Sequence, residues 1–370
     1  MQRALALAIL LTACHPSEPP AVAPTPAPVA SIEAAASPPL PPAPKADALP
    51  APKPTTIPLA RTGDLSLDAT LADADKAFEA GDLDKALSGY EAARKSAPKR
   101  AAGSVGVARV KVTKAAPSLG FAAAEKNPDV TAAAKELHRA TELEPTFGPA
   151  YLEEGRALLL LGDAPKAEAA LRKGLAMVPG EAEAHSALGV ALLATGKSEE
   201  ALLELTKAKD LDPGSAARRG NLGTVLFMRG RVPDAIKEYE TQTRLVPDDA
   251  RAHSDLGTAF LAQSDFAHAL PELHRAIELD PKRATFRSNL GYALQIEGKV
   301  ADAIVEYREA LKLDAKLASA WINLATALAR EPKTRAEARQ ALKTAAALDP
   351  TDPRVKANLE ELDALEKARK

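Results

Sequence analysis

The chain has little of what several classes of protein require. Its 370 residues include one cysteine, only 4% aromatic residues and a formal net charge of −2. A single cysteine excludes a disulfide framework within the chain and any zinc finger built on cysteine pairs. A nearly balanced charge excludes the basic surface of a general nucleic-acid binder. The hydrophobic share of 46% is rich in alanine, and the 30 prolines are unevenly spread. This composition indicates closely packed helices with a separate proline-rich part.

The first residues are typical of an export signal. In residues 1–13, one arginine precedes an apolar run of eight residues, too short for a membrane-spanning helix of about 20 residues. The run ends in the tetrapeptide Leu11-Thr12-Ala13-Cys14. It resembles the lipobox of bacterial lipoproteins, which implies a diacylglycerol on Cys14 and cleavage before it. The alternative is an ordinary signal peptide followed by a chance cysteine. His15 stands where an aspartate would signal inner-membrane retention, so the resemblance favours the outer membrane.

Residues 14–63 are rich in proline and alanine and show no apolar periodicity. Proline fixes φ and removes a backbone donor, so this composition predicts a disordered, semi-extended tether. At about 3.1 Å per residue, such a tether reaches on the order of 100 Å from a membrane surface.

The remaining chain, residues 64–370, repeats every 34 residues. Turn residues, alanines and terminating prolines recur in the same register as the glycines Gly155, Gly189, Gly223, Gly257 and Gly291. Within each unit the apolar residues fall at helical spacings of three and four, and a break in the middle predicts a hairpin of two helices. A glycine inside a helix costs about 1 kcal/mol relative to alanine, so these glycines predict close helix crossings.

These columns resemble the tetratricopeptide repeat (TPR) family. The resemblance implies an all-α, right-handed α-solenoid of about eight helix hairpins, ending in a capping helix over 353–370. The expected repeats are 67–100, 101–147 with an inserted loop at 114–129, 148–181, 182–215, 216–249, 250–283, 284–317 and 318–352.

The candidates for catalysis or cofactor binding have simpler explanations. Gly196-Lys197-Ser198 follows Ala191 as in a relaxed phosphate-binding loop, but the repeat places it at a hairpin turn, without the strand such a loop needs. His185 and His253 share one repeat column, which indicates packing or interface residues rather than metal ligands. We therefore expect no enzyme activity, no cofactor, no metal and no nucleotide.

A groove on the concave face is the expected site, because the first helix of each repeat lines that face. One column of these helices is rich in asparagine, and in some TPR arrays such amides hold the backbone of an extended peptide. An amide offers both a donor and an acceptor, so this is possible without side-chain selectivity; local structural use of the asparagines is the equal alternative. The expected groove residues are Asn221, Asp255, Asn289, Asn323, Arg156, Arg251 and Tyr292.

The sequence thus predicts a lipid-anchored, periplasm-facing adaptor or scaffold that binds a protein partner, with no nucleic-acid partner. The resemblance extends to lipoproteins that assemble envelope machines such as type IV pilus secretins. The alternative is a structural envelope protein that oligomerises or bridges layers through the solenoid. An envelope enzyme or regulatory subunit with a nucleotide site is a third possibility, based only on Gly196-Lys197-Ser198.

Overall fold

A computed structural model describes residues 56–116 and 124–367. The signal, Cys14 and the tether up to residue 55 lie outside this described part. The described residues form 17 α-helices and one short 3₁₀ helix, and they contain no strand. The predicted all-α fold is therefore confirmed. Among these helices, none is both long and apolar enough to cross a membrane.

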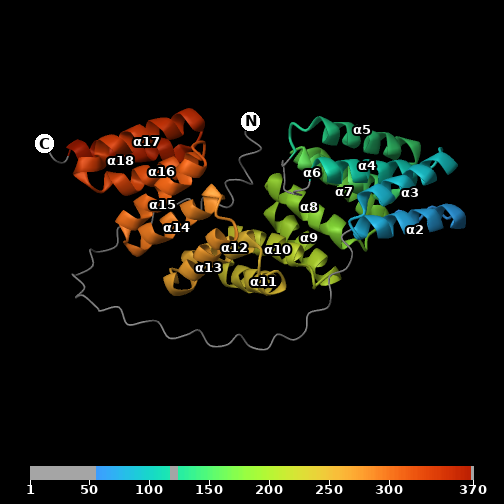
Figure 1. Cartoon of the computed structure of the whole chain (residues 1–370), viewed down its shortest axis with the longest axis horizontal. Helices are drawn as coiled ribbons and strands as arrows, with labels where there is room; N and C mark the ends of the chain where they lie inside the picture. Colours follow the sequence, from blue (N-terminus) through green and yellow to red (C-terminus); the bar gives the residue numbers. More distant parts are fainter. Residues whose placement is uncertain (1–55, 117–123, 368–370) are drawn as a thin grey trace.

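Sixteen of the helices form eight hairpins (Figure 1). The first helices of the hairpins are α2 (Leu65–Glu79), α4 (Ala102–Ala115), α6 (Gly148–Leu160), α8 (Ala182–Ala194), α10 (Ala216–Met228), α12 (Ala250–Ala262), α14 (Ala284–Glu297) and α16 (Ala318–Ala329). The second helices are α3 (Leu83–Ser96), α5 (Pro128–Leu143), α7 (Ala164–Met177), α9 (Ser198–Leu211), α11 (Val232–Leu245), α13 (Phe266–Leu279), α15 (Val300–Leu313) and, after η1 (Pro332–Thr334), α17 (Arg335–Leu348). The last helix, α18 (Pro353–Lys367), packs on α16 and α17 as the expected cap.

The two helices of a hairpin meet where glycine removes a side chain. A Cβ on Gly189 would lie 2.4 Å from Cγ of Leu205, and one on Gly257 would lie 2.8 Å from Cγ of Leu273. These distances are shorter than van der Waals contact, so only glycine allows the helices to approach this closely. The close helix crossings predicted from the glycine column are confirmed.

The turn between the helices requires a residue with positive φ. Glycine fills this place in most hairpins, for example Gly162 and Gly196 with φ of 78° and 81°. In the hairpin of α12 and α13 the same place holds Ser264, with φ of 57°. The left-handed region costs a residue with a Cβ about 1–2 kcal/mol, so Ser264 is a local strain that its siblings avoid.

In four hairpins, a side chain near the start of the first helix contacts the loop that precedes that helix. Nε2 of His185 lies 2.9 Å from the carbonyl oxygen of Pro179, and Nδ1 lies 2.5 Å from a carboxylate oxygen of Glu204. The same repeat position contacts the preceding loop carbonyl in other hairpins, through Arg219, His253 and Trp321. The interpretation of His185 and His253 as packing or interface residues is confirmed.

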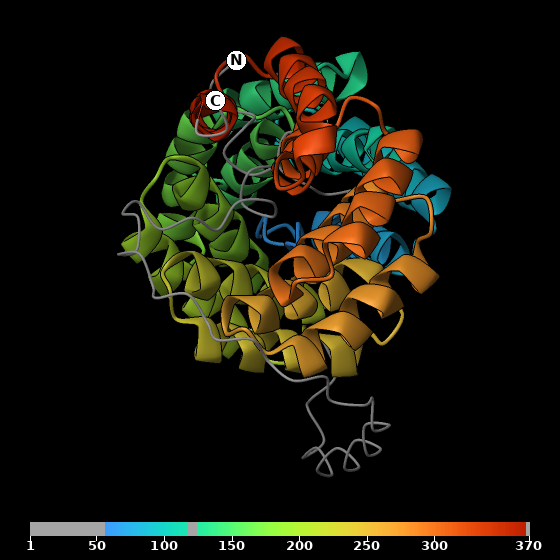
Figure 2. The ribbon, with the colours of Figure 1, turned by 90° about the vertical axis from the view of Figure 1, so that its left-hand side faces the viewer.

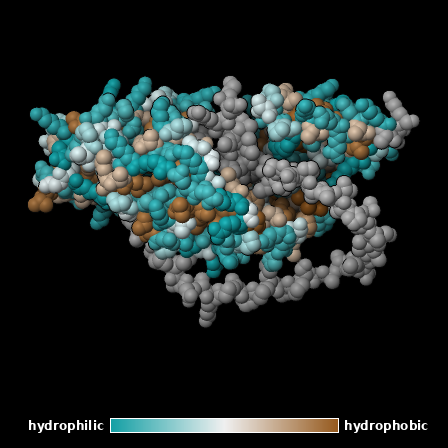
Figure 3. Space-filling model, turned by 180° about the vertical axis from the view of Figure 1, so that it is seen from behind, coloured by the Kyte–Doolittle hydropathy of each residue, from teal (hydrophilic) through white to brown (hydrophobic). Residues whose placement is uncertain are grey.

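The hairpins stack into a superhelix that forms a ring when viewed along its length (Figure 2). Most pairs of successive first helices contact one another, so the first helices lie on the inside of the curve. Seen from behind, the surface is mostly hydrophilic with small apolar groups between (Figure 3). The inside of the curve is called the inner groove below.

The structure differs from the prediction at the end of the tether and near the inserted loop. The predicted tether ends at residue 63, but the side chains of Ile57 and Leu59 are completely buried. The tether boundary at 63 is therefore wrong for residues 56–61, which belong to the folded part. The loop predicted at 114–129 is shorter at both ends, because α4 continues to Ala115 and α5 begins at Pro128.

Candidate protein-interaction groove

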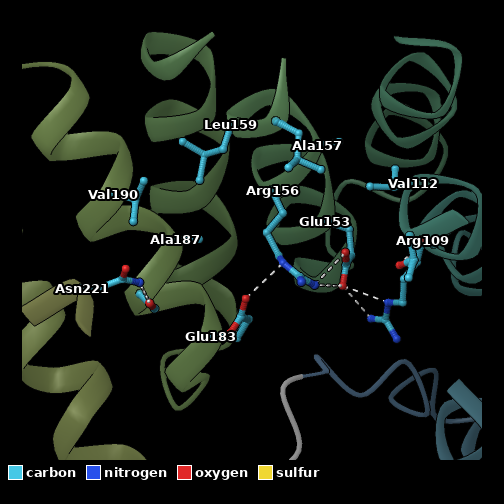
Figure 4. A pocket seen from close by; sticks show the side chains of 13 residues that line it. Arg109, Val112, Glu153, Arg156, Ala157, Leu159, Glu183, Ala187, Val190 and Asn221 are labelled. Atoms are coloured by element: carbon cyan, nitrogen blue, oxygen red, sulfur yellow. Dashed lines mark hydrogen bonds and ion pairs between the residues drawn. The ribbon is translucent and has the colours of Figure 1, made fainter. Parts of the chain in front are cut away.

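A hollow of about 110 Å³ lies in the inner groove between α4, α6, α8 and α10 (Figure 4). Its volume is below the 300–1,000 Å³ of a typical small-molecule site, and it has room for a side chain rather than for a whole ligand. Charged and apolar side chains line it together, among them Arg109, Glu153, Arg156, Glu183, Val190 and Asn221. A surface of this kind is suited to part of an extended chain.

The floor of the groove carries a row of alternating charges. Nε of Arg109 donates to Oε1 of Glu153 at 2.9 Å, and Nη1 of the same arginine lies 3.1 Å from Oδ1 of Asp75. Glu153 also accepts from Nη1 of Arg156 at 3.2 Å, and Nε of Arg156 lies 3.4 Å from Glu183. The row crosses four successive first helices, α2, α4, α6 and α8, and so connects four repeats.

The row continues into α10 and α9. Nη2 of Arg218 lies 3.5 Å from Oε2 of Glu183, and its Nη1 donates to Oδ2 of Asp212 at 2.5 Å. The side chain of Arg218 is only 2% exposed. We call the complete set the charged row: Asp75, Arg109, Glu153, Arg156, Glu183, Arg218 and Asp212.

Burial opposes the ionised forms in the charged row, and the neighbouring opposite charges restore them. Burial alone would raise the pKa of Glu153, but Arg109 and Arg156 outweigh it and hold the pKa below its usual range. Burial would lower the pKa of Arg109, and Glu153, Tyr90 and Asp75 raise it instead. Glu153 and Arg109 are thus each held in the ionised form by the opposite charges around them.

Of this row, the sequence predicts only Arg156 as a groove residue. The structure pairs it with Glu153 and Glu183. A signal for Glu153 was available, because it lies 34 residues before Ala187 and so belongs to the asparagine-rich column. Arg109 lies within the apolar helix α4, where a completely buried arginine requires a buried acid nearby.

Of the asparagines of the predicted column, Asn221 lines the hollow, and both Asn221 and Asn289 make contacts between repeats. Nδ2 of Asn221 donates to Oγ of Ser186 at 3.0 Å, and Nδ2 of Asn289 donates to Oγ of Ser254 at 3.0 Å. Each bond joins two successive first helices. Asn323 is half-buried in α16. Peptide binding by these amides stays a prediction, and their contacts show a structural use between repeats.

Asp255 occupies the same column in α12 and is 7% exposed. Burial raises its pKa to about 7, opposed by Arg251, whose Nε is 3.7 Å from Oδ2. Arg251 itself is exposed, and Tyr292 is half-buried in α14. The structure therefore brings Arg251 and Asp255 together, one turn apart on α12, and separates them from the charged row of the earlier repeats.

The phosphate-loop-like sequence forms the turn between α8 and α9, as its place in the repeat predicts. Residues up to Ala194 are helical, and the backbone N–H of Lys197 donates to the carbonyl of Leu192 at 2.8 Å. The side chain of Lys197 pairs with Glu168 at 2.7 Å. These donors are committed to the hairpin rather than directed at a phosphate. Within the described ranges, no cluster of three potential metal ligands occurs.

Stacked helix hairpins around an inner groove define a class of protein, the α-solenoid repeat proteins. Matches to the tetratricopeptide repeat model cover residues 121–182, 152–216, 220–284, 254–318 and 289–353, more than half of the sequence. The chain belongs to the tetratricopeptide repeat family. Proteins of this family generally mediate protein–protein interaction, and their fold is typically a non-catalytic scaffold.

Solved structures share the fold at low identity. The Cut9–Hcn1 hetero-tetramer of APC/C is 18% identical, with a TM-score of 0.60 over 82% of this chain. This chain covers only 57% of that protein's chain. A monomeric mutant of IFIT1 with Gppp-AAAA is 15% identical, with a TM-score of 0.57 over 80% of this chain and 71% of its own. The pilF protein of Pseudomonas aeruginosa is 22% identical, with a TM-score of 0.48 over 58% of this chain and 97% of its own. No curated protein matches in sequence.

Proposed function

We propose that this chain is a lipid-anchored adaptor of the bacterial envelope, which holds an extended segment of a partner protein in the inner groove. The observation that supports binding in the groove is the hollow beside the charged row, which is lined by Arg156, Glu183 and Asn221 together with the half-buried Val190. Charged groups fix the register of a bound segment, and apolar contacts supply affinity.

The tetrapeptide ending in Cys14 supports the anchor, because it follows directly on a short apolar run. Two or three acyl chains on one cysteine suffice for stable membrane attachment. The proline-rich stretch behind it supplies reach. In this proposal the solenoid faces the periplasm, from the outer membrane rather than the inner, and assists the assembly of an envelope complex such as a type IV pilus secretin.

Two columns of exposed apolar residues on the second helices bear on the structural alternative. Leu203 on α9 and Val305 on α15 are exposed apolar residues at equivalent repeat positions. Between them, the same position is occupied by Lys237 and Pro271. This column is therefore interrupted. A second column, at the last residue of each second helix from α5 to α17, is apolar throughout, and four of its members are exposed: Leu143, Met177, Leu313 and Leu348. Self-association through this column is the form of the structural alternative that the surface supports.

Affinity capture from detergent-solubilised envelopes tests the groove. The bait is the full chain, and two variants each add one arginine to the same hairpin: Val190→Arg fills the hollow, and Leu203→Arg changes the exposed side of α9. We expect a partner that the wild type and Leu203→Arg retain and that Val190→Arg loses. Equal retention by both variants would refute groove binding.

A further inference from the structure

Residues 56–61, called the inner segment, run along the groove although their composition is that of the tether. Ile57 and Leu59 are completely buried, whereas Pro58 between them is exposed. Residues 57–59 thus alternate as an extended chain does with one face against a surface, and a tight turn follows, because the N–H of Arg61 donates to the carbonyl oxygen of Leu59 at 2.8 Å. The blue start of the described chain lies inside the ring of helices (Figure 2).

The inner segment is held by its backbone. Its Leu59 N–H donates to Oδ2 of Asp75 at 2.7 Å, and Nη2 of Arg109 donates to the carbonyl oxygen of Ile57. Both contacts would form with any side chain on the segment. Backbone hydrogen bonds combined with pockets for alternate side chains are the mode by which extended peptides are recognised. Pro58 has no backbone N–H, and because this residue is exposed, no hydrogen-bond donor to the groove is missing there.

The two buried side chains join different parts of the solenoid. Leu59 belongs to the core of α2 to α6, and Ile57 belongs to the core that continues from α6 through α12. At the other end, the guanidinium of Arg61 pairs with Glu181, the residue before α8. Three side chains with a spacing of two residues thus specify the register of this segment.

The inner segment and the hollow are parts of one surface. Arg109 contacts the carbonyl oxygen of Ile57 and also lines the hollow. Glu153, which pairs with Arg109, lines the hollow as well. A segment bound in the hollow and continuing along the groove therefore reaches the place that the chain's own residues fill.

We propose that the inner segment is an internal ligand of the groove, and that the partner segment has the same chemistry and displaces it. That chemistry is an apolar residue, a second apolar residue two positions later in an extended stretch, and an arginine two positions after that, beyond a tight turn. This inference rests on the proposed groove-binding function and names its ligand class. Because the internal copy is tethered at an effective concentration on the order of mM, it weakens binding of a free peptide to the intact chain.

The test uses the full chain and a fluorescent synthetic peptide of residues 56–63. We expect the variant Ile57→Ser/Leu59→Ser, whose own segment is weakened, to bind the peptide at least tenfold more tightly than the wild type. A peptide carrying the same two serines is expected not to bind. Equal affinity for the wild type and the variant, or no binding to a variant that keeps its helical circular dichroism, would overturn the proposal.

A charge exchange controls for specificity without disturbing the core. When Glu181→Arg is added to the Ile57→Ser/Leu59→Ser variant, the affinity for the peptide should fall several-fold. A peptide that carries Arg61→Glu should restore this affinity. No recovery would contradict the assigned register.

Hydrogen exchange of the wild type covers the case in which the serine variant does not fold. A displaceable ligand opens alone, so residues 56–61 should exchange at least tenfold faster than α4. Equal protection would make the segment a fixed part of the core. If peptide binding fails while the Val190→Arg effect on partner capture persists, this inference fails and the proposed function stands.

Discussion

Replacing Arg109 by methionine should destabilise the amino-terminal repeats specifically. The arginine side chain is 1% exposed, and it neutralises both Asp75 and Glu153. Breaking a buried ion pair costs about 3–5 kcal/mol, because the remaining charge stays buried. We expect a loss of about 3 kcal/mol, at the lower end of this range. Asp75 keeps hydrogen bonds from Tyr90 and from the Leu59 amide, and Glu153 keeps its pair with Arg156.

The loss should depend on pH with a definite sign. In the wild type the pKa of Glu153 is lowered on folding, so its ionic contribution is present above the unfolded pKa of about 4.3 and is lost as the pH falls. Without Arg109 this contribution is largely gone. The difference in unfolding free energy between wild type and variant should therefore be largest at pH 7, smaller at pH 4, and should disappear only as the pH falls through the lowered folded-state pKa of Glu153.

Urea unfolding at both pH values measures the magnitude, and hydrogen exchange locates the effect. Repeat arrays are coupled mainly between neighbours, so α2, α4 and α6 should lose protection while α14 to α18 keep theirs. The matched control is Arg330→Met at an exposed position, which should change stability by less than about 0.5 kcal/mol. A loss below about 1 kcal/mol at pH 7, or an equal loss at both pH values, would refute the charged row as described.

Four further outcomes are expected. Asp255→Asn should stabilise the chain by up to about 4 kcal/mol at pH 8 and by almost nothing near pH 4, because the folded-state pKa of about 7 lies some three units above the unfolded value. Equal urea midpoints of the wild type and the variant at pH 8 would contradict the burial of a charge at this position. Gly257→Leu should cost a few kcal/mol by forcing the side chain against Leu273, so an unchanged melting temperature would contradict the close crossing. Ser264→Gly should raise stability by about 1 kcal/mol in urea unfolding, since the residue has positive φ. Cys14→Ser should release the protein from membranes in cell fractionation, and retention would rule out the lipid anchor.

The repeat could be predicted from the sequence because its signals are local and recur. Gly189 and Gly257 mark helix crossings, and the positive φ of Gly196 follows from its place in the turn. Periodicity also placed the histidines of the first helices at the contacts between hairpins. These features could be predicted because the residues involved contact only their own repeat or the adjacent one.

The charged row and the inner segment depend on contacts that sequence spacing does not encode. Arg109 and Glu153 are 44 residues apart, across the irregular second repeat, where the period of 34 is lost. Ile57 and Leu59 are only two apolar residues in a proline-rich stretch, too few to register as a strand pattern. Their burial depends on the curvature of the stacked helices, which exists only after the repeats have assembled.

That curvature gives the protein a mechanical property. Each hairpin packs mainly on its immediate neighbours, and the inner segment adds a link between α2, α4 and the residue before α8. A small rotation at each interface therefore adds to the next, and the two ends can travel far while every local contact is nearly preserved. A pull on one end is therefore expected to widen the pitch of the array and to change the groove along its length. If the proposed anchor fixes one end while a partner binds further along, such stretching would pass force on to the groove.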